Sequence, residues 1–352
     1  MPTQQAIIIQ SPKAPFVLGS KDIPSPAKGE VLLKVMSVGL NPMNPMQREY
    51  DILIDEYPAV LGGDIVGTVE ALGDGVEGFK KGDRVCTSAL MGGFQQYTTL
   101  PAAVLIRLPD NASFDEVATF PITFGTACVG LFAPAPIGLG LNPTFSWDKP
   151  QRGESALVIG GATSVGQFAI QLFKFLGFTR IVTYASKVHF DYLKQLGATE
   201  CIDRGEVSVD SLVTHPALTP PVKVIYDVTG ALNAAFDCVA EGGSIATAVP
   251  MSKLERDLDS KKVTLVRVQG YIFGPDIWPP KRDNLVAYLA TPDHTTFGKV
   301  VVKNLPRLLE EKVIVGNRYE VLANGLAGIL EGLERFGKGS VSGLKLVGHP
   351  QE

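Results

Sequence analysis

Residues 156–187 read ALVIGGATSVGQFAIQLFKFLGFTRIVTYASK, and a strand, a glycine turn, a helix and a second strand explain the whole pattern. The run 156–159 is apolar throughout, as expected of a parallel strand that is buried on both faces. Apolar residues recur at helical spacing after the turn, and Gly177 stands where a helix commonly ends. The stretch therefore predicts the start of a parallel α/β sheet.

The turn between this strand and helix partly matches a phosphate-binding fingerprint. Gly161, Thr163 and Gly166 occupy the three fixed positions of G-x-G-x-x-G, so the middle glycine is replaced. Small residues at such a turn let a pyrophosphate approach the backbone N–H groups at the mouth of a helix. The turn is consistent with a dinucleotide site, and an ordinary strand-to-helix connection is the alternative.

The end of the second strand favours one form of the cofactor. A unit that prefers NAD places Asp or Glu about 20 residues after the glycines, where it binds the ribose 2′-hydroxyl. Ser186 stands at that distance from Gly166 (186 − 166 = 20), and Lys187 and His189 follow it. A hydroxyl beside basic side chains suits a 2′-phosphate, which predicts NADPH. The alternative is that Lys187 and His189 are the solvated start of a helix.

Length and composition limit the possible functions. A chain of 352 residues is long enough for two domains, each with its own core. Lys and Arg number 32 against 36 Asp and Glu, so the net charge of −4 predicts neither nucleic acid nor an anionic membrane as partner. The four cysteines form no C-x-x-C pair, and no signal sequence or run of 18 apolar residues is present. We expect a reduced, soluble, cytoplasmic protein.

Secondary-structure patterns change along the chain. The first 120 residues are rich in strands, and the alternation in 30–35 suits a half-buried antiparallel sheet. The Pro- and Gly-rich segment 133–152 lacks periodicity and is interpreted as a long surface insertion of open role. From residue 156 to a last strand at 263–273, strands and helices alternate, which predicts a doubly wound parallel sheet. Helices at 285–289, 305–311 and 323–336 and strands near 319–322 and 344–347 complete the chain.

Several landmarks occur in a fixed order: Asn41-Pro42, LGGDIVG at 61–67, GDRV at 82–85, the glycine turn and SGLKLV at 342–347. In this order the chain resembles the medium-chain dehydrogenase/reductase superfamily. The segment 160–197, with GGATSVG and FDYL, is most similar to fungal trans-acting enoyl reductases and to quinone-oxidoreductase-like double-bond reductases. The resemblance implies an α/β fold in which a GroES-like β catalytic domain (1–122 and 276–352) flanks a Rossmann NADPH-binding domain (123–275).

The sequence departs from the zinc alcohol dehydrogenases of that superfamily. Gly63 stands where those enzymes carry a histidine, no cysteine lies near Asn41, and the four cysteines of their structural zinc lobe are absent. All four histidines lie in predicted loops or termini without ligand spacing: His189, His215, His294 and His349. We therefore expect no metal. The resemblance implies that zinc-free members reduce activated C=C bonds or quinones with NADPH.

The resemblance also assigns cofactor and substrate residues by position. By this resemblance the glycine turn is expected to cover the pyrophosphate, the end of the second strand to bind the 2′-phosphate, and Arg204 to stack on adenine. Later segments are expected to pass the nicotinamide ribose and carboxamide, and Lys345 to reach the cofactor phosphates or ribose. The expected cofactor residues are Gly161, Ala162, Thr163, Ser164, Val165, Gly166, Ser186, Lys187, His189, Arg204, Ala248, Val249, Ile272, Phe273 and Lys345; the expected pocket residues are Asn41, Phe124 and Tyr271.

The proton donor is the least defined part of the site. Related reductases often carry a lysine four residues after the proline of their Asn-Pro motif, and this chain has Met46 there. Tyr50 and Tyr57 are candidate donors in its place, although a tyrosine in such a loop often only packs. Thr126 matches the family position that faces the nicotinamide, with a helix-capping or core role as the alternative.

These features predict NADPH-dependent reduction of the C=C bond of an α,β-unsaturated carbonyl, an enal, enone or enoyl thioester. Hydride goes to the β-carbon while negative charge builds on the carbonyl oxygen. Quinone reduction on the same fold and NADPH binding without catalysis are the alternatives. The sequence leaves open whether the substrate is free or carrier-bound. It also leaves open whether the protein is a monomer or a homodimer, because the sheet edge predicted at 268–273 either pairs in a dimer or remains covered.

Overall fold

The computed structural model describes residues 2–270, 272 and 291–352. The chain divides into two compact units. The split unit consists of both chain ends, Met1–Ile122 with Phe273–Glu352, and the Rossmann unit consists of Thr123–Ile272.

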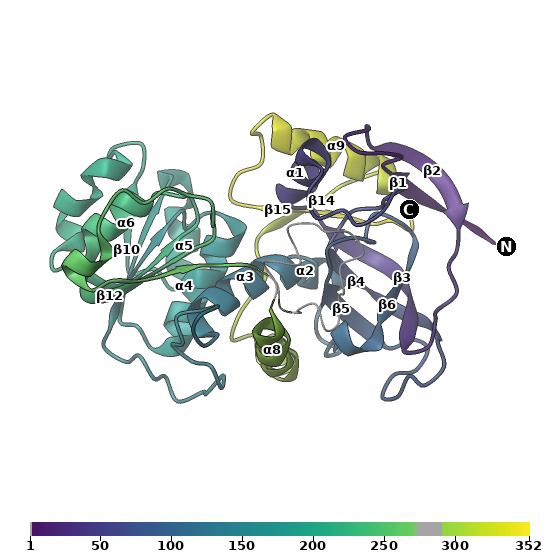
Figure 1. Cartoon of the computed structure of the whole chain (residues 1–352), viewed down its shortest axis with the longest axis horizontal. Helices are drawn as coiled ribbons and strands as arrows, with labels where there is room; N and C mark the ends of the chain where they lie inside the picture. The colour runs from purple at the N-terminus through teal and green to yellow at the C-terminus, as the bar shows by residue number, and fades with distance from the viewer. Residues whose placement is uncertain (1, 271, 273–290) are drawn as a thin grey trace. The chain divides into compact units, whose positions relative to one another are not determined.

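The Rossmann unit is built on six parallel strands, and the predicted doubly wound sheet is confirmed (Figure 1). In space the strands follow the order β10-β9-β8-β11-β12-β13, which reverses direction between β8 and β11. At such a reversal the loops after the strands separate and leave a crevice at their carboxyl ends. The strands are β8 (Ser155–Ile159), β9 (Arg180–Ala185), β10 (Glu200–Asp203), β11 (Val222–Asp227), β12 (Val239–Thr247) and β13 (Thr264–Arg267).

Helices connect these strands, and local sequence defines where α4 (Ser164–Leu176) begins and ends. Thr163 is its N-cap, and Gly177 takes the left-handed φ of 93° at which glycine commonly ends a helix. The other helices and 3₁₀ turns are α3 (Pro121–Phe132), η2 (Lys187–His189), α5 (Phe190–Leu196), η3 (Val209–Thr214), η4 (Pro216–Leu218), α6 (Leu232–Cys238) and η5 (Leu258–Lys261).

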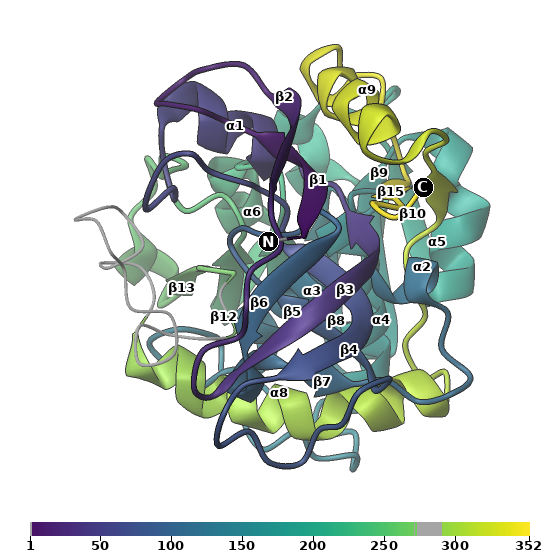
Figure 2. The same ribbon diagram turned by 90° about the vertical axis from the view of Figure 1, so that its right-hand side faces the viewer.

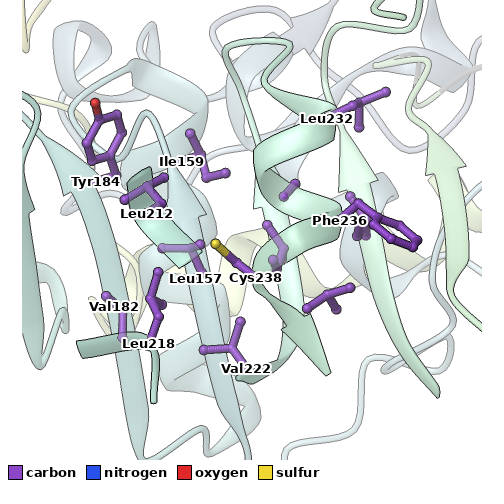
Figure 3. Close-up of a cluster of buried hydrophobic side chains, with 14 of the residues drawn as sticks. Leu157, Ile159, Val182, Tyr184, Leu212, Leu218, Val222, Leu232, Phe236 and Cys238 are labelled. Carbon is purple, nitrogen blue, oxygen red and sulfur yellow. The ribbon is translucent and has the colours of Figure 1, made fainter. Parts of the chain in front are cut away.

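A buried apolar cluster covers one face of this sheet (Figure 3). Leu157 and Ile159 of β8 and Val182 of β9 belong to it, and α6 contributes Phe236 and Cys238. The continuous apolar runs that identified these strands in the sequence are thus explained by burial in a parallel sheet.

The predicted surface insertion at 133–152 is instead partly a packed segment of the Rossmann unit. Its backbone returns to α3 through hydrogen bonds from Leu139 N–H to the Gly130 carbonyl (2.9 Å) and from Leu141 N–H to the Leu131 carbonyl (3.0 Å). Phe145 is buried with its ring centroid 5.0 Å from that of Phe132. Sequence periodicity could not show this, because the segment packs through single aromatic side chains and turns rather than through a regular element.

The split unit is built on a seven-stranded, mainly antiparallel sheet, as the GroES-like prediction requires (Figure 2). The C-terminal strand β15 pairs with β3 near the other chain end, which joins the two halves of this unit. The strands are β3 (Glu30–Gly39), β4 (Asp64–Leu72), β5 (Arg84–Ser88), β6 (Tyr97–Pro101), β7 (Ile106–Arg107), β14 (Tyr319–Val321) and β15 (Lys345–Gly348), with β1 (Thr3–Ile8) and β2 (Val17–Asp22) as a separate pair.

Helical segments of the split unit are α1 (Met43–Tyr50), η1 (Ala102–Val104), α2 (Phe114–Val117), α8 (Pro292–Glu310) and α9 (Gly325–Gly337). Within the described part of the chain, no helix combines the length and apolar character that a membrane span requires.

Two predictions about single segments need correction, and a third falls outside the described residues. His294 belongs to the first turn of α8, where it accepts a hydrogen bond from Thr291 N–H (3.0 Å), rather than to a loop. The strand predicted at 263–273 ends at Arg267, so residues 268–270 do not extend the sheet edge that was expected to pair in a dimer. The helix predicted at 285–289 lies outside the described residues.

The C-terminal segment is held by a histidine between two carboxylates. His349 Nε2 lies 2.8 Å from Asp115 Oδ1, and its Nδ1 lies 2.9 Å from Glu352 Oε1. Burial lowers the pKa of His349, but its bonds to Glu352 and Asp115 outweigh this effect, so the pKa is raised above the usual value. A raised folded-state pKa adds stability that is complete below the unfolded value and is lost as pH rises through the folded value.

We expect His349→Gln to lower the free energy of unfolding by about 1 kcal/mol or less near pH 5.5, because the pair is partly exposed. This difference should shrink as pH rises through the raised pKa of His349 in the folded protein, because the imidazole then loses its charge in both states. Thermal unfolding of both proteins across this pH range provides the measurement. A difference in midpoint that stays constant with pH would contradict the ion-pair account.

Candidate functional site

The turn after β8 requires its glycines. Gly160 has a φ of 90°, which L side chains rarely adopt. A Cβ atom on Gly161 would overlap Thr183 Oγ1, and one on Gly166 would overlap the Gly160 carbonyl oxygen. The chain therefore turns from strand to helix without side chains over the backbone at Gly160, Gly161 and Gly166. This lets a phosphate come close to the backbone N–H groups.

Thr163 explains why the middle glycine of the fingerprint is absent. Its backbone is extended, so the position needs no glycine. The Thr163 hydroxyl donates to the Gly160 carbonyl (2.7 Å) and accepts from Gly166 N–H (3.1 Å), which caps α4. Ala162 is fixed by a hydrogen bond from Gln167 Nε2 to its carbonyl (2.9 Å), and Ser164 and Val165 begin the helix. The turn is thus preorganised, and its role in pyrophosphate binding stays a prediction.

The ends of β9 and β10 bring together three of the four residues expected at the 2′-phosphate and adenine. Arg204 Nε donates to Ser186 Oγ (2.6 Å), and Lys187 N–H donates to Asp203 Oδ1 (3.3 Å). The Lys187 ammonium is exposed, 3.4 Å from an equally exposed Glu206 carboxylate, a pair of little energetic weight. A hydroxyl and two cations therefore lie at one strand edge. The fourth residue, His189, is buried in the turn that follows.

Asp227 organises the opposite loops at the same edge of the sheet, and the sequence analysis missed it. This fully buried carboxylate ends β11 and accepts hydrogen bonds from the N–H groups of Thr229 (2.9 Å) and Gly230 (3.1 Å) and from the Thr247 hydroxyl (3.1 Å). Its backbone carbonyl accepts from Ala248 N–H (2.8 Å), and the Thr247 hydroxyl accepts from Val249 N–H (3.2 Å). Ala248 and Val249 are therefore held in place by hydrogen bonds that lead back to Asp227. The sequence shows only a single acid after an apolar strand, and this pattern does not indicate that the acid positions a loop.

Residues predicted near the nicotinamide are largely buried. Phe124 packs edge to face against Phe168, with ring centroids 5.7 Å apart. The Thr126 carbonyl accepts a hydrogen bond from the Tyr226 hydroxyl (2.8 Å), and burial raises the pKa of Tyr226, which keeps that donor protonated.

The carboxamide segment is described only at Ile272, which is buried. A Cβ atom on Gly125 of α3 would overlap this side chain. Tyr271 and Phe273, predicted for the carboxamide and the substrate, lie outside the described residues.

The split unit holds a buried polar cluster of Asn41, Asp64 and Lys345. The Lys345 ammonium lies 2.7 Å from Asp64 Oδ2 and 2.6 Å from Asn41 Oδ1, and Asn41 Nδ2 donates to the same carboxylate (2.7 Å). Asp64 Oδ1 accepts from Ile122 N–H (2.6 Å). Lys345 is only 3% exposed and Asp64 is fully buried. Two residues predicted for different parts of the site, Asn41 and Lys345, therefore share one carboxylate.

Helix α1 continues from this cluster. Asn44 Oδ1 accepts from Asn41 N–H (2.8 Å), which ties the start of the helix to the cluster. Tyr50, the candidate proton donor, lies at the last position of α1 and is exposed. Tyr57, the other candidate, donates to Asp51 Oδ1 (2.6 Å).

The position equivalent to a zinc-binding histidine cannot carry a side chain here. A Cβ atom on Gly63 would overlap the Ala89 carbonyl oxygen. In the described ranges, no group of three His, Cys, Asp or Glu side chains could hold a metal ion. The residues beside Gly63 thus do not fit a zinc site, and Asp64 is already bound by Lys345 and Asn41.

Two family models match the chain: the alcohol dehydrogenase GroES-like domain over residues 27–110 and the zinc-binding dehydrogenase over residues 164–286. The trans-enoyl reductase tazE of Aspergillus terreus is 33% identical over 74% of this chain and 90% of its own length. The trans-enoyl reductase tndF of Aspergillus flavipes is 36% identical over 67% of this chain and 71% of its own length.

Solved structures show the same fold at lower identity. An alcohol dehydrogenase superfamily protein from Novosphingobium aromaticivorans has a TM-score of 0.76 at 23% identity over 98% of both chains. The human synaptic vesicle membrane protein VAT-1 homolog-like protein has a TM-score of 0.76 at 23% identity over 99% of both chains.

The chain therefore belongs to the medium-chain dehydrogenase/reductase superfamily and is an oxidoreductase related to fungal trans-enoyl reductases. Membership implies a nicotinamide cofactor.

We expect Lys345→Met to lower the free energy of unfolding by about 3–5 kcal/mol, because Asp64 would remain buried with an unpaired charge. The double variant Asp64→Asn/Lys345→Met should recover more than half of that loss, since it removes both charges. Lys81→Met, which breaks the exposed pair with Glu70, is the matched control and should cost about 1 kcal/mol or less. If thermal unfolding showed that Lys345→Met costs no more stability than Lys81→Met, the role of the buried pair would be contradicted.

Proposed function

We propose that this protein is an NADPH-dependent reductase of the activated C=C bond in α,β-unsaturated carbonyl compounds, with hydride delivered to the β-carbon. The observation that carries the cofactor assignment is the Ser186, Lys187 and Arg204 cluster at the carboxyl ends of β9 and β10. A hydroxyl and two cations suit a phosphate monoester, whereas a ribose 2′-hydroxyl is usually bound by an acid. The two nearby carboxylates are already engaged within the cluster, because Asp203 accepts from the N–H groups of Lys187 and Gly205 and Glu206 pairs with the Lys187 ammonium.

Residues of the Rossmann unit would hold the cofactor along the carboxyl edge of the sheet. The N-terminal turn of α4 offers backbone N–H groups and a positive dipole end to the pyrophosphate. Arg204 would stack on adenine while its Nε contacts Ser186. Ala248 and Val249 would support the nicotinamide ribose, and Asp227 holds them in place through Thr247 and its own carbonyl.

Reduction without a metal is supported by the split unit. Gly63 has no room for a ligand side chain, and the carboxylate of the next residue, Asp64, is paired with the Lys345 ammonium. Within the described residues the Lys345 ammonium donates to Asp64 and Asn41, so it neutralises the buried carboxylate beside Gly63 and leaves Asp64 no role as a metal ligand. Alcohol oxidation usually relies on a Lewis acid, whereas reduction of a conjugated C=C bond needs orientation and a stabilised oxyanion.

NADPH, when bound, supplies the hydride. The protein must orient the alkene, stabilise charge on the carbonyl oxygen and provide a proton for the α-carbon. Thr126 is proposed to face the nicotinamide, with its carbonyl held by Tyr226. Tyr50, exposed at the end of α1, is the proposed proton donor.

The similarity to trans-enoyl reductases favours an enoyl thioester as substrate, either free or attached to a carrier. A steady-state screen with NADPH and NADH across an enal, an enone, an enoyl thioester and a naphthoquinone tests the proposal. We expect turnover of at least one unsaturated carbonyl with NADPH preferred. Turnover of the quinone alone would point to quinone reduction, and tight NADPH binding without any turnover would point to a non-catalytic protein.

We expect Lys187→Ala to weaken NADPH binding by roughly ten- to a hundredfold and to leave NADH binding nearly unchanged, because only NADPH carries the 2′-phosphate. Lys194→Ala removes another exposed lysine of the Rossmann unit and is the matched control. Fluorescence titration with both cofactors gives the two dissociation constants. Equal loss of affinity for NADPH and NADH would rule out the 2′-phosphate role.

A further inference from the structure

The sequence FDYL at 190–193, one of the two segments that mark the resemblance to trans-acting enoyl reductases, contains none of the expected cofactor residues. Its tyrosine, Tyr192, is half-buried on α5, the helix that follows the expected 2′-phosphate loop. The Tyr192 hydroxyl donates to Oε1 of Gln167, a fully buried residue in the first turn of α4 (3.2 Å). Tyr192 therefore connects α5 to the helix that begins at the glycine turn.

Gln167 extends this connection into the glycine turn itself. Its Nε2 donates to the Ala162 carbonyl (2.9 Å). The N–H of the same peptide group, on Thr163, donates to the Gly160 carbonyl (3.0 Å). The peptide group between Ala162 and Thr163 is therefore held at both its C=O and its N–H. A glutamine can make both of its contacts at once, because its Nε2 donates while its Oε1 accepts from Tyr192.

The held peptide group restricts the neighbouring Ala162 N–H. Among the described residues this N–H has no acceptor, whereas Gly161 N–H donates to the Tyr184 carbonyl (3.3 Å) and Gly166 N–H donates to the Thr163 hydroxyl (3.1 Å). Two backbone angles at Ala162 join its N–H to the held peptide group, so fixing that group limits where the N–H points. An N–H at the mouth of a helix suits an anionic oxygen.

The glycine turn and the expected 2′-phosphate loop are also joined through the backbone. The Tyr184 carbonyl accepts from the N–H groups of both Gly160 (3.0 Å) and Gly161 (3.3 Å). Tyr184 lies one residue before the end of β9, and Ser186 and Lys187 follow directly. The contact between Tyr192 and Gln167 adds a second link, made by side chains, between the helices that follow the two loops.

Resting on the proposed function, we propose that Tyr192 is a positioning residue for the cofactor, whose hydroxyl acts through Gln167 to direct the Ala162 N–H at the pyrophosphate. NADPH and NADH both carry a pyrophosphate, so both should depend on Tyr192. This distinguishes Tyr192 from Lys187, which is proposed to contact the 2′-phosphate that only NADPH carries.

Tyr192→Phe removes one hydroxyl and keeps the ring. We expect it to weaken NADPH and NADH binding alike by roughly two- to tenfold, the range for one neutral hydrogen bond. Affinity for adenosine 2′-monophosphate, which has no pyrophosphate, should stay unchanged. Gln167→Met should weaken both dinucleotides at least as much, and adding Tyr192→Phe to it should cost nothing further, because both side chains act on Ala162. Fluorescence titration gives the dinucleotide constants, and displacement of NADPH gives that of the monophosphate.

Thr199→Val is the matched control, because it also removes one hydroxyl from the Rossmann unit. Thr199 Oγ1 accepts from Ile181 N–H (2.9 Å) near the amino end of β9, the opposite edge of the sheet. This variant should leave all three affinities unchanged.

Unchanged affinity of Tyr192→Phe for both dinucleotides would overturn the proposal. So would an equal loss of affinity for adenosine 2′-monophosphate, because Tyr192 would then support the Rossmann unit in general. Binding and turnover separate the two claims. Weaker binding of both dinucleotides by Tyr192→Phe, with no reduction of any alkene by the wild-type protein, would support the positioning role and refute the reductase. Alkene reduction by the wild-type protein, with unchanged dinucleotide affinities in Tyr192→Phe, would do the reverse.

Discussion

The split unit depends on the buried ion pair between Lys345 and Asp64, two residues 281 positions apart in the chain. A buried charge without its partner is costly, so the pair links the two chain ends and each side chain needs the other in place. The pair also limits its neighbours: a Cβ atom on Gly39 would crowd both side chains. Asn41 is hydrogen-bonded to both Asp64 and Lys345, and its N–H donates to Asn44 of α1. The buried face of α1 is therefore polar, because it extends the hydrogen bonds of the ion pair.

The Rossmann unit uses a comparable device at the carboxyl edge of its sheet. Asp227 is a buried carboxylate whose partners are mostly backbone N–H groups and hydroxyls, so it fixes loops rather than a distant strand. The glycine turn and the Ser186 and Arg204 contact lie at the ends of neighbouring parallel strands. In both units, therefore, one buried acid positions the backbone that the proposed chemistry needs.

Much of this fold could be predicted from the sequence, because parallel strands leave continuous apolar runs and the landmark motifs occur in one order. Thr163 was misleading, since the fingerprint does not show that a threonine in extended conformation can cap the helix. The sequence predicts a surface insertion at 133–152, because single buried aromatics such as Phe145 carry no periodic signal. Asp227 and the polar buried face of α1 depend on partners far away in the chain, which no local pattern reveals.

Transfer of a labelled hydride tests the central claim most directly. NADPH deuterated at the transferable position of the nicotinamide would be incubated with the protein and an enoyl thioester, and the product analysed by NMR and mass spectrometry. The account predicts a saturated thioester with one deuterium on the β-carbon. Deuterium on the carbonyl carbon, or a saturated product without deuterium, would contradict it.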